Sequence, residues 1–564
     1  MGGVLRRISG GGLFLLVFVL LALVVQHAFP PVAALQIRRA ALDFATQWQD
    51  GNLGQVSFDP ASAPDMGGGD AQAIADNTTW MVRDISPVDN DRPVSVTLVG
   101  GPRNLTDTTA SQTLAVTWQL DSGRTWTYQT DVVVANTANR LRVRWTPETV
   151  YPDLRHGLVL RAHRLVAARA PIQDPAGNAF PATATGLAAN LIGTVQPATH
   201  ELTELDEGRI APGDRVGVSG LEQRYDAQLA GRAGVEVDIV RDGTGYQPLE
   251  PVIKQVFVSP PTPGKPVVLT LDQRLQASAE AAVAGRATPT ALVAVDIQSG
   301  AVLAVADSQR TPGDVLGLQG QYPPGSTFRL VTMLALNRFA GIGPNDAADC
   351  RELHYLGQQF SNRAGAPATA DVPFAAAFAG DCITGFGAAA PSLTNAQLRE
   401  AATALGLEQP NGLGYPGYDG VIPPTKDLLE NVEDAIGEGG VLTSPLALAR
   451  ASATVASGIQ RPPSLVTQPV PELPAATHAL HPGEQALLAQ LMRSSVPPEL
   501  RGVGNGAVSA VCGVAAYGPA ADATQHVWCT GFQGSTAFAV LVTKSNAGPS
   551  VAASIAASFL NRPR

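Results

Sequence analysis

The stretch "YPPGSTFRLVT", Tyr322–Thr332, decides the fold of the longest part of this chain. A serine sits in a Pro-Gly turn that opens an apolar helical run, and a cation follows three residues later. Positions i and i+3 share a face on the first turn of a helix, so Ser326 and Arg329 are expected side by side. A basic neighbour that takes the serine proton is typical of some acyl-transfer enzymes. Arginine keeps its own proton to a pKa above about 12, so the sequence predicts an unusual active site or the remains of one.

The composition excludes several classes of protein. With 564 residues, of which 45% are apolar, the chain is long enough for several folded domains and is not disordered. Its formal charge of −10 argues against a nucleic-acid partner, because no strongly basic face is available to neutralise phosphates. No cofactor motif is present, and the scattered histidines do not indicate a metal site.

The N-terminus predicts a single membrane anchor within residues 1–30. Arg6 and Arg7 precede an unbroken apolar run, Leu13–Val25, which extends to the length of a short span when the preceding glycines are counted. A cleaved signal peptide is the alternative, although the small residues after the run make a mediocre cleavage site. In either case the positive-inside rule predicts that the rest of the chain lies outside the cytoplasm, at the plasma membrane.

Four cysteines agree with an oxidising compartment. Their positions suggest two pairs, Cys350 with Cys382 and Cys512 with Cys529, and the second pair would join adjacent antiparallel strands. A pair of this kind requires Cα atoms within about 7 Å. A reactive Cys382 thiol is the alternative to the first pair.

The chain divides into segments of different periodicity. Residues 35–150 begin with an amphipathic helix and continue with alternating strands, which favours a helix packed on an antiparallel sheet. Residues 157–257 form a second unit, and the proline-rich Ser259–Pro266 is a linker. Residues 265–564 open with a strand, a helix and a hairpin at Gln298–Gly300 and close with further strands, which is typical of the α+β class.

Five ordered stretches together resemble one family. "APGDRVGVSGLEQRYDAQLAGRAG", "LTLDQRLQASAEAA", "ALVAVDIQSGAVLAVAD", "YPPGSTF" and "IGEGGVLTSPLALARASATVASG" are similar to successive landmarks of class B penicillin-binding proteins, specifically those with an NTF2-like, methicillin-resistance-type N-terminal domain. The resemblance implies an α+β multidomain protein. Its expected parts are a membrane anchor, an NTF2-like domain, a pedestal or dimerisation domain and a transpeptidase-like domain of the serine β-lactamase type.

Family membership implies D,D-transpeptidation, in which a serine attacks a D-Ala-D-Ala stem peptide and a β-lactam is captured by the same serine. The chemistry depends on the motifs S-x-x-K, S-x-N and K-T-G. The first falls on Ser326 to Arg329, where the nucleophile is kept and the lysine base is replaced by arginine. A guanidinium is not expected to serve as the base.

The other two motifs are degraded further. In the second, Asp381 stands at the serine position and Ile383 at the asparagine position. Neither Ser361–Arg363 nor Ser392–Asn395 has the S-x-N spacing. In the third, Val514–Ala516 replaces Lys-Thr-Gly, so the cation and the hydroxyl that hold the substrate carboxylate are missing. An oxyanion hole is expected from backbone N–H groups at Ser326 and near Tyr517.

Three functions follow as alternatives. The favoured one is a catalytically inactive scaffold or regulator in peptidoglycan synthesis, with other cell-wall or division proteins as partners. The second is a divergent enzyme or resistance protein of low β-lactam affinity, acylated at Ser326 with Asp381 as an improvised base. The third is a sensor that binds cell-wall fragments or β-lactams without turnover.

The surviving polar residues also have structural interpretations. Ser326 is expected to cap its helix, and Arg329 and Asp381 are expected to form an ion pair. The six tryptophans are expected in the hydrophobic cores: Trp48, Trp80, Trp118, Trp126, Trp145 and Trp528.

Overall fold

The computed structural model describes residues 32–561 except 63, 65–67, 86–90, 122, 184, 187, 202–209, 243–250, 310, 472–477, 518–523 and 546. The anchor predicted within residues 1–30 therefore lies outside the described residues. Within the described ranges, no helix is long and apolar enough to cross a bilayer.

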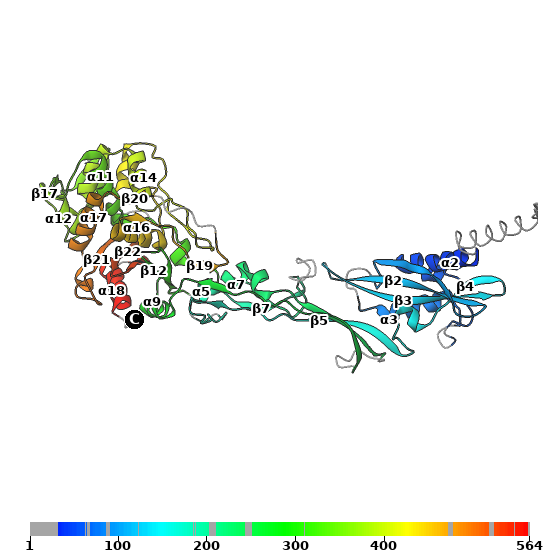
Figure 1. The fold of residues 1–564 in the computed structure, drawn as a ribbon. Helices are drawn as coiled ribbons and strands as arrows, with labels where there is room; N and C mark the ends of the chain where they lie inside the picture. The colour runs from blue at the N-terminus through cyan, green and yellow to red at the C-terminus, as the bar shows by residue number, and fades with distance from the viewer. Residues whose placement is uncertain are drawn as a thin grey trace, which may run out of the picture. The chain divides into compact units, whose positions relative to one another are not determined.

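The chain forms two compact units, coloured along the sequence in Figure 1. The first comprises residues up to 168, 199–214 and 232–262, and the second comprises 169–198, 215–231 and 263–564. The stretch 157–257, expected as one pedestal domain, is thus divided between both units.

In the first unit, helix α2 packs on a four-stranded antiparallel sheet in the order β1-β2-β3-β4. Buried residues of α2 recur at helical spacing, at Ala41, Phe44, Ala45 and Trp48, whereas strand β2 buries every second residue around Trp118. Both periodicities agree with the sequence prediction. The bounds are α2 Val32–Gln49, η1 Leu53–Gln55, α3 Ala71–Val82, β1 Ser95–Asn104, β2 Thr109–Asp121, β3 Arg124–Thr137, β4 Arg140–Arg144 and α4 Pro147–Val150.

A second sheet of the first unit, in the order β10-β9-β5, shares its hydrophobic core with the first sheet. Val237 and Ile239 of the central strand β9 lie in this core together with Trp118 and Trp145. The strands are β5 Leu158–Leu165, β9 Gly234–Arg241 and β10 Val252–Ser259.

One tryptophan departs from the expected core position. Trp80 is 41% exposed, donates its indole N–H to Asp242 and lies beneath the guanidinium of Arg83. The expectation of a core residue was therefore wrong here, because a charged partner at each side gives the ring a place at the surface. The other five tryptophans are buried.

The second unit is built on a five-stranded antiparallel sheet in the order β13-β12-β23-β22-β21. Leu292 and Ala294 of β12 face a core with α9 and α18, and Val293 and Val295 face the opposite core with α16. Coverage of both faces explains why "TALVAVD" is a continuous apolar run. Figure 1 shows α9 beside α18 at the sheet. The bounds are α9 Gln273–Val283, β12 Thr290–Asp296, β13 Val302–Asp307, α16 Pro445–Ser457, β21 Ser509–Tyr517, β22 Thr524–Gln533, β23 Thr536–Ser545 and α18 Ser550–Leu560.

A helical layer around α11 adds a third core to this unit. It contains Phe328 and Leu334 together with side chains from α12, α13, α14, α15 and α17. These elements are η3 Gly325–Phe328, α11 Arg329–Ala340, α12 Phe374–Ala379, α13 Ile383–Ala389, η4 Ala390–Ser392, α14 Asn395–Ala404, α15 Leu428–Ala435 and α17 Pro482–Ser494. The short helix η5, Pro498–Leu500, packs instead in the core with α9 and α18.

Short elements complete the second unit. Strands β19, β11 and β6 form a three-stranded sheet, and the other short strands form two-stranded pairs. They are β6 Ile172–Gln173, α5 Ala189–Ile192, β7 Val195–Pro197, β8 Arg215–Gly217, α7 Gly220–Arg224, α8 Asp226–Ala230, β11 Val267–Leu269, α10 Leu316–Gln319, β14 Ala347–Ala348, β15 Leu353–Tyr355, β16 Gln358–Phe360, β17 Val372–Pro373, β18 Ile459–Gln460, β19 Val466–Gln468 and β20 His478–Ala479.

Candidate functional site around Ser326

Ser326 lies within the short helix η3, which leads directly into α11. Its hydroxyl is buried and accepts a hydrogen bond from the N–H of Val514 in β21, at 3.2 Å. The expected capping role was wrong, because Pro324 occupies the N-cap position and no side chain caps η3. The serine instead joins the helix to the strand. We refer to Ser326, Arg329, Asp381 and Val514–Ala516 as the serine site.

Two glycines allow β21 to approach the serine closely. Gly325 has a φ of +54°, and a Cβ added there would lie 2.1 Å from the carbonyl oxygen of Val514. A Cβ added at Gly513 would lie 2.1 Å from Ser326 Oγ. Such distances exclude a side chain at either position without movement of the backbone or of the serine.

Arg329 is held by hydrogen bonds to four acceptors and is 4% exposed. Its Nε donates to the carbonyl of Phe378 at 3.0 Å, and one Nη donates to the carbonyl of Ser326 at 2.6 Å. The second Nη donates to the carbonyl of Cys512 at 3.1 Å. Burial lowers the pKa of Arg329, and the carboxylate of Asp381 opposes this shift. The charged side chain of Arg329 therefore joins three chain segments by hydrogen bonds: the serine turn, the end of α12 with the residues that follow it, and β21.

Asp381 forms the expected ion pair, with Oδ1 at 2.8 Å from Arg329. Its other oxygen accepts from Arg363 at 3.3 Å, so both carboxylate oxygens face a guanidinium. Asp381 has a φ of +62°, a left-handed conformation that aspartate and asparagine adopt more often than most other residues apart from glycine. Because both carboxylate oxygens are engaged by guanidiniums, Asp381 is a poor candidate for the improvised base. Ile383 is the first residue of α13.

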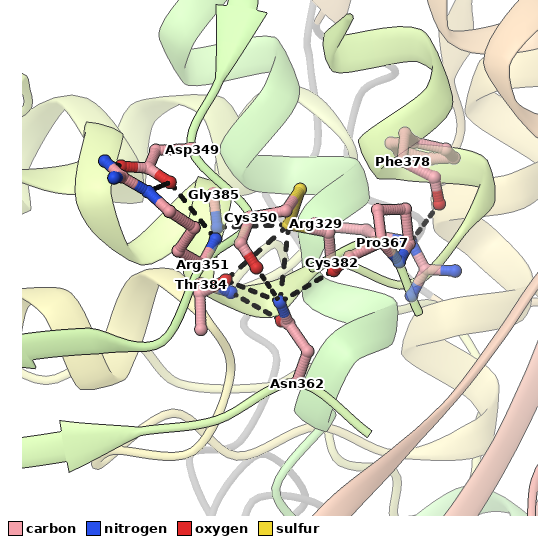
Figure 2. The surroundings of a disulfide bond; sticks show 10 residues. All are labelled: Arg329, Asp349, Cys350, Arg351, Asn362, Pro367, Phe378, Cys382, Thr384 and Gly385. Carbon is pink, nitrogen blue, oxygen red and sulfur yellow. Dashed lines mark hydrogen bonds and ion pairs between the residues drawn. A yellow bond between two sulfur atoms is a disulfide. The ribbon is translucent and has the colours of Figure 1, made fainter. Parts of the chain in front are cut away.

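The structure contains the disulfide Cys350–Cys382, with Cα atoms 5.8 Å apart. Figure 2 shows Asn362 beside this bond. The Asn362 amide donates to the carbonyls of Cys350 and Pro367 and to the hydroxyl of Thr384, and its oxygen accepts the N–H of Thr384. Asn362 is thus used to fix the loop that carries Asp381. This role of Asn362 was not predicted from the sequence.

Strand β21 supplies the third motif position and the second disulfide. Cys512 and Cys529 are direct partners in the β21–β22 ladder and are bonded, with Cα atoms 4.0 Å apart. N–H groups alternate in direction along an antiparallel strand. Because the N–H of Val514 points to Ser326, that of Ala516 also points away from β22, whereas that of Tyr517 points toward Thr524. The outward N–H expected near Tyr517 therefore belongs to Ala516.

Glu438 is a residue of this site that the sequence analysis missed. It follows Gly437, whose carbonyl accepts the N–H of Gly325 at 2.8 Å. Burial raises the pKa of Glu438 to about 6, and a hydrogen bond from the backbone of Ala516 opposes this shift. The available signal was a single acidic residue between glycines in "IGEGG".

In the part of the chain that the structure describes, no group of three or more His, Cys, Asp or Glu side chains is arranged to hold a metal ion.

Models of three domain families match this chain. The penicillin-binding protein transpeptidase domain matches residues 290–561, the penicillin-binding protein dimerisation domain matches 183–269, and the NTF2-like N-terminal transpeptidase domain matches 97–157. The fold and the serine site thus define a multidomain protein of the penicillin-binding class. The chain belongs to the class B penicillin-binding-protein family.

The chain is also similar to two curated proteins. The chain is 26% identical over 280 residues to the peptidoglycan D,D-transpeptidase FtsI of Escherichia coli, in strain K12 and in O157:H7. These alignments cover 46% of this chain and 46% of each relative, so the chain spans about half the length of the curated relatives it matches. A solved complex between penicillin-binding protein PBP2 and MreC from Helicobacter pylori has a similar fold. There the TM-score is 0.59 at 15% identity, over 72% of this chain and 98% of that one.

Proposed function

We propose that this protein is a catalytically inactive homologue of the D,D-transpeptidases, which acts as a scaffold or regulator of peptidoglycan synthesis. The observation that carries the proposal is Arg329. It stands where the family has a lysine base, and its donors are engaged by Phe378, Ser326, Asp381 and Cys512. A serine hydroxyl without an adjacent base is a weak nucleophile.

The remaining polar groups of the site support the same proposal. Asp381 is paired with two arginines, and Val514 and Ala515 offer no side-chain donor to a substrate carboxylate. Correct positioning of the substrate lowers the activation barrier of a well-oriented reaction by roughly 7–11 kcal/mol. Loss of the side chains that position the substrate therefore removes a large part of the rate enhancement. A plasma-membrane anchor and an extracytoplasmic location belong to this proposal, as does a partner among the cell-wall or division proteins.

A test of the proposal is covalent labelling with a fluorescent penicillin, followed by mass spectrometry of the peptide that contains Ser326. We expect no adduct on the full-length protein in detergent under conditions that label FtsI of E. coli. An adduct that disappears in Ser326→Ala, or release of D-alanine from a stem peptide, would contradict the proposal.

Restoring the lysine alone is not expected to restore chemistry. In Arg329→Lys we expect no penicillin labelling of Ser326, because the second and third motifs remain incomplete. The same assay measures this outcome, and robust labelling of Arg329→Lys would show that the arginine alone blocks acylation.

A divergent, acylable enzyme is the second candidate. It is favoured by the retained Ser326 hydroxyl and by the outward N–H of Ala516, a donor of the kind that stabilises an acyl oxyanion. The labelling experiment separates the two candidates. Titration of Ser326→Ala with stem peptide or β-lactam tests a third, a sensor without turnover.

A further inference from the structure

Helix α2 of the first unit has two faces of different character. One face packs on the sheet of β1–β4 and buries Phe44 and Trp48, and Figure 1 shows the helix along one side of that sheet. The opposite face carries Leu35 and Leu42, which are 54% and 53% exposed. Seven residues are close to two helical turns, so these two leucines lie in line along the helix.

Two arginines flank this line of leucines. Successive helix positions differ by about 100°, so Arg38 lies on one side of the line and Arg39 on the other. Arg38 donates a hydrogen bond to the carbonyl of Gly100 at 3.1 Å. Among the residues that the structure describes, neither arginine forms an ion pair, and Asp43 is the only acid in the sequence of α2. The face therefore keeps a net positive charge beside its exposed leucines.

The position of α2 in the chain indicates what can cover this face. The apolar run Leu13–Val25, predicted to anchor the chain, is separated from α2 only by residues 26–31. The chain steps from Val25 to Val32 reach at most about 25 Å when fully extended. The helix itself has 18 residues and is therefore about 27 Å long. A bilayer that holds the anchor is thus within reach of the whole helix.

We propose that this outer face of α2, consisting of Leu35, Arg38, Arg39 and Leu42, docks on the surface of the bilayer. The leucines lie at the boundary between headgroups and acyl chains, and the arginines bind the phosphates of anionic phospholipids. Interfacial helices combine apolar and basic side chains in this way. The positive charge of the face is complementary to an anionic membrane surface. The proposal rests on the membrane anchor that belongs to the proposed function, whereas the composition of the face does not.

A docked helix and a helix that is only tethered differ in the depth of their leucines. In a docked helix, which lies parallel to the membrane, Leu35 and Leu42 lie at the same depth. In a helix that stands upright on its tether, Leu42 lies about 10 Å farther from the bilayer than Leu35, because each residue adds about 1.5 Å along the axis. A comparison of the two positions therefore separates docking from tethering.

The first experiment measures these depths by fluorescence quenching. All four cysteines are in disulfides, so Leu35→Cys and Leu42→Cys each provide a single free thiol for a nitrobenzoxadiazole label. The full-length protein is placed in nanodiscs of phosphatidylcholine with phosphatidylglycerol and a lipid that carries a nitroxide quencher near its headgroup. We expect equal quenching at both positions and none in Leu428→Cys, a control whose native leucine is 58% exposed in the second unit.

Two results of this experiment overturn the proposal. The first is quenching at position 42 that is less than about half of that at position 35, as expected for an upright, tethered helix. The second is a label at position 42 with the emission of an apolar environment but no quenching by the lipid. That result would show that protein, such as a second copy of this chain, covers the face.

The second experiment tests the arginines. Arg38→Gln/Arg39→Gln should reduce quenching at position 42 at least twofold, as should nanodiscs without phosphatidylglycerol. A rise in salt from about 0.1 M to about 1 M, which shortens the Debye length from about 10 Å to about 3 Å, should have the same effect. The matched control is Arg155→Gln/Arg241→Gln, which removes the same charge from exposed positions elsewhere in the first unit and should leave quenching unchanged. Equal quenching in the two double variants overturns the proposal.

Failure of the anchor has a different signature from failure of docking. Vesicles of the same lipids that carry the full-length protein are washed with about 1 M salt, which screens surface charges. Release of a protein that was quenched at both positions before the wash would contradict the anchor and support docking. A protein that resists the wash but is not quenched at position 42 would support the anchor and overturn docking. Neither result depends on acylation of Ser326.

Discussion

At the scale of single residues, Arg329 is the buried charge on which the serine site depends. Removing one partner of a buried ion pair leaves an uncompensated charge and unpaired acceptors, which costs about 3–5 kcal/mol. We expect Arg329→Met to lower the melting temperature of the second unit, although Arg363 limits the loss by staying with Asp381. Thermal unfolding followed by circular dichroism measures this effect.

Arg363→Met is the matched control, since Arg363 pairs with the same carboxylate but its side chain is 40% exposed. Exposed ion pairs contribute only about 0–1 kcal/mol, so a much smaller shift is expected. Equal melting-temperature shifts for the two variants would show that Arg329 contributes no more to stability than an exposed ion pair does.

Gly513 and Ser326 form a steric pair that a double-mutant cycle can test. In Gly513→Ala the new Cβ would lie 2.1 Å from Ser326 Oγ, and overpacking of this kind costs about 1–3 kcal/mol. The cost should be smaller in a Ser326→Ala background, where the oxygen is absent. Urea unfolding of the four proteins gives the coupling energy, and strictly additive effects would contradict the contact.

Residue identities predicted part of this site. The letters of the first motif placed Ser326 beside Arg329, and the replacement of both motif residues suggested the pair with Asp381, which the structure contains. The positions of Glu438 and Asn362 in the site were not predicted, because their contacts join segments that are far apart in sequence. No local pattern distinguishes such an acid or amide from a residue in a solvated turn.

At the scale of elements, Asp307 at the end of β13 holds the start of α10. Its carboxyl accepts the N–H groups of Leu316 at 2.9 Å and Gly317 at 3.0 Å, and burial raises its pKa to about 7. An unfolded aspartate has a pKa near 3.9, so the folded protein keeps a proton that the unfolded chain releases. The resulting stability is complete below about pH 4 and is lost as the pH rises through about 7.

The expected result is a melting temperature of the second unit that falls between pH 4.5 and 7.5, with a smaller slope in Asp307→Asn. The difference between the two proteins can reach roughly 1.4 kcal/mol per pH unit within this window. Other acids contribute to both slopes, and their effect cancels in the comparison. Equal slopes in the wild type and in Asp307→Asn would show that groups other than Asp307 cause the pH dependence.

Hydrophobic periodicity predicted most elements near the site. The hairpin at Gln298–Gly300 joins β12 to β13 as expected, and the helix opened by "YPPGSTF" lies beside β21. The partition of residues 157–257 between two units escaped prediction. Strands β5, β9 and β10 of this stretch pack in one core, whereas β6 and the helices α5, α7 and α8 pack in another. A local sequence pattern predicts that a residue is buried but not in which core it lies.

At the scale of the whole molecule, the two units have separate hydrophobic cores. Trp118→Ala should therefore lower the melting temperature of the first unit, and Leu334→Ala that of the second unit. Each change removes a fully buried side chain. Large-to-small changes of this kind cost about 2–5 kcal/mol. Differential scanning calorimetry of the full-length protein measures both transitions, and a shift of both by either variant would show that the cores unfold together.

The close packing of Gly325, Gly437 and Gly513 around Ser326 has a historical consequence. A lysine at position 329 would lose the bonds that the guanidinium makes to Phe378 and Cys512, and a side chain at position 513 would collide with the serine. Substitutions at these positions are thus harmful one at a time, and selection would remove the single variants before a compensating set was complete. The packing around Ser326 therefore limits which sequences this lineage can reach by single steps.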